Sequence, residues 1–160
     1  MEEKVEKSIL LAFDDSENAM RAVEFTAKSF RLDYRVTLFS VLPDIQTMCD
    51  MNNPSLTPYF VSEQVNFCGM EEKKKELMGE AMEKAKKILV QAGFQEDLIQ
   101  TKTQVRKKGV ARDIVEEAKT GYDTIVMGRR GLSAIAEFFV GSVTHKVLHL
   151  AKGLSVVLVE

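Results

Sequence analysis

Glycines and hydroxyl side chains near the end of the chain are the residues best suited to chemistry. Gly128 and Gly131 lie three residues apart and directly follow an apolar run that ends at Met127. Glycine lets backbone amides approach phosphate oxygens without a Cβ in the way. Gly141 and Ser142 then open a periodic stretch, where the free amides and dipole of a helix start favour an anion. The pattern predicts a phosphate-binding loop.

The neighbouring side chains leave the chemistry of this loop open. Thr144 adds a second hydroxyl donor, and Arg129 and Arg130 either supply positive charge to a triphosphate or are solvated. Glycines three apart also end strands and form turns for purely structural reasons. The sequence contains neither G-x-x-x-x-G-K-[ST] nor a G-x-G-x-x-G fingerprint after its first apolar run, so ordinary P-loop and dinucleotide-binding motifs are excluded.

Short apolar runs alternate with longer periodic stretches, and they position the loop. The predicted strands are Ser8 to Phe13, Tyr34 to Leu42, Ile99 to Val105, Asp123 to Met127 and Leu154 to Val159. The predicted helices cover about 17–30, 70–92, 110–120 and 142–152. This alternation predicts an α/β fold, a single doubly wound, mostly parallel five-stranded sheet with helices on both faces. Ligands bind at the carboxyl ends of strands in such sheets.

The segment 43–69 interrupts this alternation. It carries all three prolines, Cys49 and Cys68, without either periodicity over a useful length. We therefore expect one domain over residues 1–160, with an irregular excursion at about 43–69 that is either irregular throughout or helical in part. Two cysteines in an irregular segment do not indicate a disulfide framework, so free thiols are expected.

Composition limits the classes of partner. The formal net charge of −2 gives no global attraction to nucleic acid or an anionic membrane. The chain has no run near the roughly 18–20 apolar residues of a membrane span, and its acidic start does not resemble a signal peptide, which predicts a cytoplasmic protein. Arg106, Lys107 and Lys108 form a short basic run, which is either solvated surface or a contact for a polyanion.

Two other catalytic patterns are incomplete. His145 and His149 have the four-residue spacing of two-histidine metal sites, but the H-E-x-x-H glutamate and a third ligand are missing. We expect them on the exposed side of the helix over 142–152. A serine hydrolase would need a nucleophile elbow such as G-x-S-x-G, which the sequence lacks.

The full spacing of the loop resembles a known family. Gly128-x2-Gly131-x9-Gly141-Ser142 fits the G-2x-G-9x-G-[ST] motif of ATP-binding universal stress proteins, and the surrounding MGRRGLSAIAEFFVGSVTHKVL is similar to that family. The resemblance covers nearly the whole chain, including an acidic residue, Asp14, after the first strand. It implies a Rossmann-like sheet with strand order 3-2-1-4-5.

The resemblance implies a site for ATP, ADP or AMP. Its phosphates and ribose would lie on Gly128, Gly131, Gly141 and Ser142, with Met127, Arg130, Val143 and Thr144 beside them. Its adenosine end would meet Asp14, the backbone of Val41, Ala12 and Phe13. Mg²⁺ or Mn²⁺ would be held through the phosphates. The resemblance also implies a homodimer through the strand Leu154 to Val159.

Three functions follow from these residues. The first is a nucleotide-responsive regulatory or stress-response protein with at most slow ATP hydrolysis, since no general base is assigned. The second is a weak ATPase or phosphotransferase in which Arg130 supplies transition-state charge. The third is a nucleotide-free dimeric interaction protein.

Overall fold

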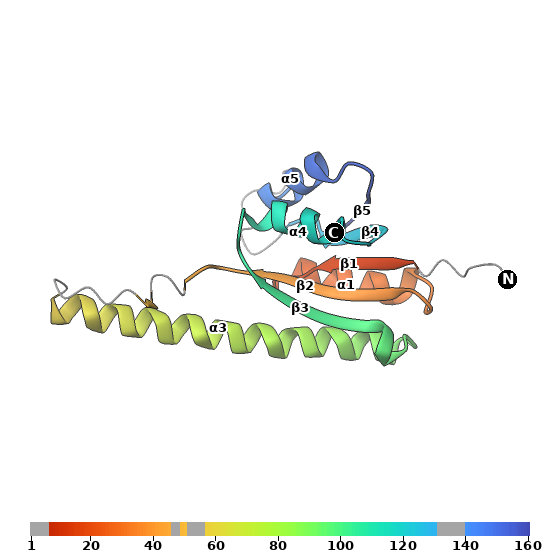
Figure 1. The fold of residues 1–160 in the computed structure, drawn as a ribbon. Coiled ribbons are helices and arrows are strands. Elements are labelled where there is room, and N and C mark those ends of the chain that lie inside the picture. The colour runs from red at the N-terminus through yellow and green to blue at the C-terminus, as the bar shows by residue number, and fades with distance from the viewer. Residues whose placement is uncertain (1–6, 46–48, 51–56, 131–139) are drawn as a thin grey trace.

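A parallel sheet forms the centre of the computed structural model, which describes residues 7–45, 49–50, 57–130 and 140–160 (Figure 1). The strands are β1 (Ser8–Ala12), β2 (Arg35–Leu42), β3 (Ile99–Val105), β4 (Thr124–Gly128) and β5 (Ser155–Val159). Their order is β3-β2-β1-β4-β5, and each neighbouring pair is parallel. The predicted strands and their order are confirmed.

The connecting helices alternate with the strands along the chain. They are α1 (Glu17–Ser29), α3 (Pro58–Gln91), α4 (Val110–Ala118) and α5 (Ser142–Leu150), with a 3-10 turn at Glu96–Leu98. Of the described helices, only α1 begins with a side-chain cap. Ser16 is the N-cap of α1, because its Oγ accepts a hydrogen bond from the amide of Ala19 at 3.1 Å. The predicted helix starts hold for α1, α4 and α5.

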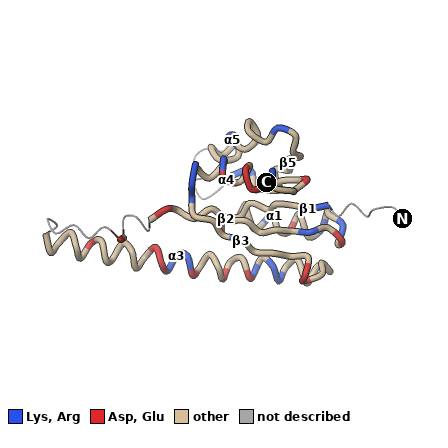
Figure 2. The backbone as a smooth tube through the Cα atoms, in the orientation of Figure 1, with Lys and Arg blue, Asp and Glu red and all other residues tan. Residues whose placement is uncertain are grey.

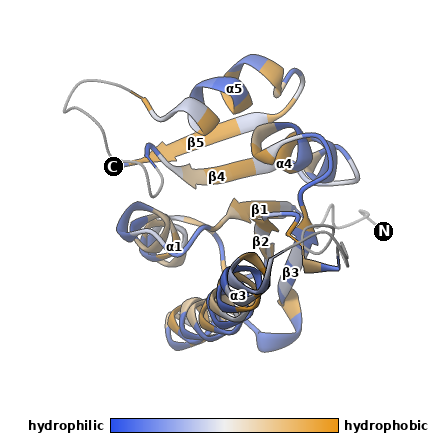
Figure 3. Cartoon of the chain, turned by 90° about the vertical axis from the view of Figure 1, so that its left-hand side faces the viewer, coloured by the Kyte–Doolittle hydropathy of each residue, from blue (hydrophilic) through white to orange (hydrophobic). Residues whose placement is uncertain are grey.

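The helices cover both faces of the sheet, as predicted. In Figure 3, α1 and α3 lie on one side and α4 and α5 on the other. Alternate residues of β1 enter the two cores: Ile9 and Leu11 pack on the α1 and α3 side, and Leu10 and Ala12 on the α4 and α5 side. A strand buried on both faces explains the nearly continuous apolar run at the start of the chain.

Helix α3 is longer than predicted. It begins at Pro58, inside the segment expected to be irregular, and its 34 residues span about 50 Å. Its last turns are buried on the sheet through Ala81, Met82, Ala85 and Leu89, whereas its first turns extend beyond the sheet (Figure 1). The excursion is therefore helical over residues 58–69, and the predicted start of this helix at about residue 70 was wrong. None of the described helices is both long enough and apolar enough to cross a membrane.

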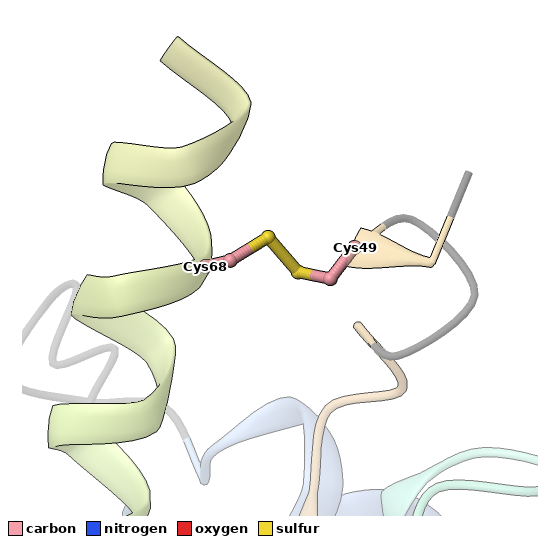
Figure 4. Close-up of a disulfide and its surroundings, with 2 residues drawn as sticks. All are labelled: Cys49 and Cys68. Atoms are coloured by element: carbon pink, nitrogen blue, oxygen red, sulfur yellow. A yellow bond between two sulfur atoms is a disulfide. The ribbon is translucent and has the colours of Figure 1, made fainter. Parts of the chain in front are cut away.

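A disulfide joins Cys49 to Cys68 (Figure 4), so the expectation of free thiols was wrong. The Cα atoms are 5.9 Å apart, which is within the usual range for this bond. Cys68 lies within α3, so the helix fixes the position of its Sγ atom opposite that of Cys49. Disulfides are typical of oxidising compartments, so the cysteines lend no support to a cytoplasmic location, which stays a prediction.

Candidate functional site

The carboxyl ends of β1, β2 and β4 meet at one edge of the sheet. β1 lies between β2 and β4, so the winding of the chain reverses at this point, where ligands bind in open α/β sheets. Phe13 continues the pairing beyond β1, since its amide donates to the carbonyl of Phe39 at 2.8 Å. The structure therefore brings the ends of three strands together, and with them the predicted residues Ala12, Phe13, Asp14, Val41, Met127 and Gly128.

The side chains of these residues face different ways. Phe13 is only 3% exposed and packs in the core on the α1 and α3 side, whereas Ala12 and Met127 belong to the core on the α4 and α5 side. Val41 is half-buried on that second side. A ligand at this edge would therefore meet the backbone of Phe13 rather than its ring.

Asp14 is positioned by the turn between β1 and α1. Its Oδ1 accepts a hydrogen bond from the amide of Ser16 at 3.2 Å, and the following Asp15 has a left-handed φ of 59°. Ser16, and not Asp14, caps α1. The half-buried carboxylate of Asp14 keeps its Oδ2 without a hydrogen-bond partner among the described residues, so it is available to a ligand hydroxyl.

Gly128 has a packing reason to be glycine. A Cβ at this position would lie 2.8 Å from both the backbone carbon and the Cβ of Asn18, in the first turn of α1. Real Cβ atoms essentially never come this close to another heavy atom. The missing side chain therefore lets α1 start directly against the end of β4, which narrows the site at its centre.

The first turn of α5 is fixed to the end of β4. Thr144 is 2% exposed, and its Oγ1 donates a hydrogen bond to the carbonyl of Gly128 at 3.3 Å. The amide of Gly141 donates to the carbonyl of Arg129 at 3.1 Å. Thr144 thus serves the backbone, and Ser142, which is exposed, is the hydroxyl that a ligand can reach.

The first amides of α5 precede the hydrogen-bond ladder of the helix. The first intrahelical bond runs from the amide of His145 to the carbonyl of Gly141, at 2.9 Å. The amides of Ser142, Val143 and Thr144 are therefore not donors within the helix. Together with the helix dipole they favour an anion here. Gly131, the remaining predicted residue, lies outside the described residues.

The two arginines after β4 have different surroundings. Arg129 forms an ion pair with Glu160, and its amide donates to the carbonyl of Val159 at 2.7 Å, so its side chain is directed to the end of β5. The guanidinium of Arg129 therefore already has a carboxylate partner. Arg130 is half-buried.

His145 and His149 lie on the exposed side of α5, as predicted, while Val147 is fully buried. Across the described residues, histidine, cysteine and carboxylate side chains form no group of three that could hold a metal ion. Sequence reasoning missed a cavity of about 630 Å³, which begins at Ser142 and Val143 and runs between α4 and α5.

Known proteins are similar to this chain in sequence and in structure. A universal stress protein of Mycolicibacterium smegmatis is 27% identical over 153 residues, which are 95% of this chain and 48% of that protein, so the chain spans about half of its length. The structure of hypothetical protein MJ0577 superposes with a TM-score of 0.66 at 27% identity and covers 96% of this chain and 94% of its own.

A further similar structure is a complex. The universal stress protein of Archaeoglobus fulgidus bound to dAMP has a TM-score of 0.59 at 22% identity, over 97% of this chain and 98% of its own. The sequence profile of the universal stress protein family matches residues 6–160 of this chain. The chain therefore belongs to the universal stress protein family.

Proposed function

We propose that this chain is an adenine-nucleotide-binding regulatory protein that holds ATP, ADP or AMP at the carboxyl edge of its sheet. The observation that carries the proposal is the junction of β4 and α5. There the free amides of the first turn of α5 and the hydroxyl of Ser142 lie next to Gly128, to which Thr144 fixes them. The dAMP complex of a family member supports an adenine nucleotide as the ligand.

Each part of the nucleotide has a counterpart at this edge. The phosphates lie on the amides and hydroxyl at the start of α5 and on the loop glycines, because these groups donate hydrogen bonds without a negative charge of their own. The ribose meets the free Oδ2 of Asp14. The adenine lies against the backbone at Val41 and Phe13.

A divalent cation would depend mainly on the nucleotide. The reachable hydroxyl of Ser142 is one oxygen ligand, and Mg²⁺ ordinarily keeps several waters beside the phosphate oxygens that bind it. Mg²⁺ or Mn²⁺ would supply charge neutralisation for the phosphates. The protein's own residues bind and orient the nucleotide.

The arrangement favours regulation over catalysis. Asp14, the acidic residue assigned to the site, is placed at the end of β1 beside the proposed ribose, and its Oδ1 accepts from Ser16. Arg129 is paired with Glu160. We therefore propose slow or no hydrolysis, with the nucleotide acting by stabilising the junction of β4 and α5.

We also propose a homodimer through β5. This strand is at one edge of the sheet, and Val156, Val157 and Leu158 are only half-buried there. An apolar edge strand that is left open is an aggregation hazard, and pairing with a second copy would cover it.

The first test is whether the purified protein carries a nucleotide. Mass spectrometry of the supernatant after denaturation should detect ATP, ADP or AMP, and calorimetry with added ATP should show binding. A protein that is purified empty and gives no heat with ATP would refute the proposal.

A glycine substitution then locates the site. Gly141 has φ −56° and ψ 151°, which any residue adopts, so Gly141→Val keeps the backbone while crowding the phosphates. Its affinity for ATP should fall at least tenfold. Gly79→Val is the matched control, because this α3 glycine has no heavy atom within 4 Å of an added Cβ and lies far along the chain from the site.

A further inference from the structure

The cavity between α4 and α5 is lined by cationic side chains from both helices. Its volume of about 630 Å³ is in the range of small-molecule sites. Figure 2 shows basic residues at the approach to α4 and on α5. The basic side chains that line the cavity are Arg106, Lys108, Arg112, His145, Lys146 and His149.

Helical spacing builds the α5 wall. His145, Lys146 and His149 follow Ser142, the first residue of α5, by three, four and seven positions. All four residues therefore lie on one side of the helix. The last of them, His149, lies about 7–8 Å along α5 beyond Thr144, the last residue assigned to the nucleotide.

A buried carboxylate holds the opposite wall in place. Asp113 is 1% exposed and accepts hydrogen bonds from the amides of Lys107 and Lys108, at 2.8 and 3.0 Å. Both oxygens of this carboxylate thereby accept hydrogen bonds from backbone amides of the turn before α4. This turn presents Arg106 and Lys108 to the cavity in a fixed position.

The positive charge of the cavity is largely unbalanced. Lys108 pairs with Glu116 at 2.7 Å, but Arg106, Arg112 and Lys146 form no ion pair within the described part of the chain. No acidic residue is among those that line the cavity. The N-terminus of α4, a helix of nine residues, also borders it and adds its positive dipole end.

We propose that this cavity binds a phosphorylated small molecule beside the adenine nucleotide. The basic side chains of the cavity hold this second ligand, whereas Ser142 and Val143 at its border belong to the nucleotide site. Clustered arginines and lysines, together with a helix N-terminus, favour the binding of a phosphate group. Val110 and Leu150 form an apolar part of the wall that suits the organic body of such a ligand. Two residues of the short basic run 106–108, Arg106 and Lys108, line this site because α5 packs beside α4.

The test uses inorganic tripolyphosphate as the probe, in calorimetry at low salt without divalent cations and with ATP present in excess. One equivalent should bind. In Arg112→Glu/Lys146→Glu its affinity should fall at least tenfold, while the charge-conserving Arg112→Lys/Lys146→Arg retains it. Both residues are exposed, so these variants should fold, which circular dichroism checks.

Two controls separate this site from the nucleotide site. Lys84→Glu/Lys87→Glu makes the same change of net charge on the exposed side of α3 and should leave tripolyphosphate binding unchanged. Asp14→Ala should weaken ATP and not tripolyphosphate. Failure of ATP to bind would refute the proposed function alone. The cavity proposal is overturned if tripolyphosphate does not bind, if ATP displaces it, or if the two charge-reversed variants bind it equally.

Discussion

Gly128 connects packing to function at the scale of a single residue. It is the last residue of β4, and its carbonyl accepts the hydrogen bond of Thr144. Its missing side chain also makes room for the backbone of Asn18, which is rigid because it belongs to the first turn of α1. The same glycine therefore sets the distance between α1 and β4 and the position of α5.

We predict that Gly128→Ala lowers the free energy of unfolding by about 1–3 kcal/mol, because α1 must move to admit the new Cβ. Gly79→Ala is the control. Gly79 is exposed within α3 and has open space around it, so alanine there should raise stability by about 0.5–1 kcal/mol. Urea unfolding measures both. A Gly128→Ala protein as stable as the wild type would contradict the close contact with Asn18.

Helix α3 differs in stability along its length. Its C-terminal half is anchored by residues such as Met82 and Leu89, which are almost fully buried. Its first turns have Tyr59 and Phe60 mostly exposed, and Thr57 makes no side-chain capping bond. The disulfide to Cys49 adds a covalent cross-link, besides the backbone, between this half and the preceding chain, across a sequence separation of 19.

We predict that reduction of the disulfide loosens only the first half of α3. A loop of about 20 residues is constrained by roughly 3 kcal/mol in the chain-entropy model, so amide protection over 58–70 should fall at least tenfold in dithiothreitol. Protection over 80–91 should not change. Hydrogen exchange read by mass spectrometry resolves the two halves.

Cys49→Ser/Cys68→Ser provides the control without a reductant, and it should reproduce the exchange pattern of the reduced protein. Equal protection over 58–70 in the oxidised and reduced states would show that the disulfide does not stabilise this half of the helix. A uniform loss along α3 would show instead that the helix behaves as one unit.

The elements that pack on the sheet could be predicted from the sequence. The part of α3 that does not pack on the sheet could not be predicted. β1 and β4 are apolar runs because both of their faces are buried, and the stripe of Ala81, Ala85 and Leu89 reflects contact with the sheet, although Leu77 at its start is exposed. Residues 58–69 lack this contrast, because their part of α3 extends beyond the sheet and has no core to face. The sequence of residues 58–69 shows no helical periodicity. Neither their helical conformation nor the disulfide that depends on it could therefore be predicted.

The same distinction applies to the candidate site. The end of each strand could be read from the sequence, which placed Asp14, Val41 and Gly128 at one edge. The contact of Gly128 with Asn18 and the cavity beside Ser142 depend on how closely helices approach each other. The spacing of residues along the sequence does not determine how closely these elements approach each other.

At the scale of the whole molecule, the sheet has two different edges. β3 carries polar and exposed residues over most of its length, which discourages pairing with another strand. β5 is mostly apolar, and its last carbonyl and the carboxylate of Glu160 both interact with Arg129 of the site loop. A partner on β5 would thus lie close to the nucleotide residues after β4.

We predict that the protein is a dimer of its 18.0 kDa chain and that Val157→Lys makes it monomeric. Val157 is half-buried in the middle of β5, and a lysine on an edge strand opposes pairing with a second copy. Leu77→Lys is the control, because Leu77 is exposed on α3, which packs on β2 and β3 at the other end of the sheet, so that variant should remain dimeric. Light scattering after size-exclusion chromatography gives the mass, and urea unfolding establishes that Val157→Lys is folded. A monomeric wild type at tens of micromolar, or a Val157→Lys dimer, would place the interface elsewhere.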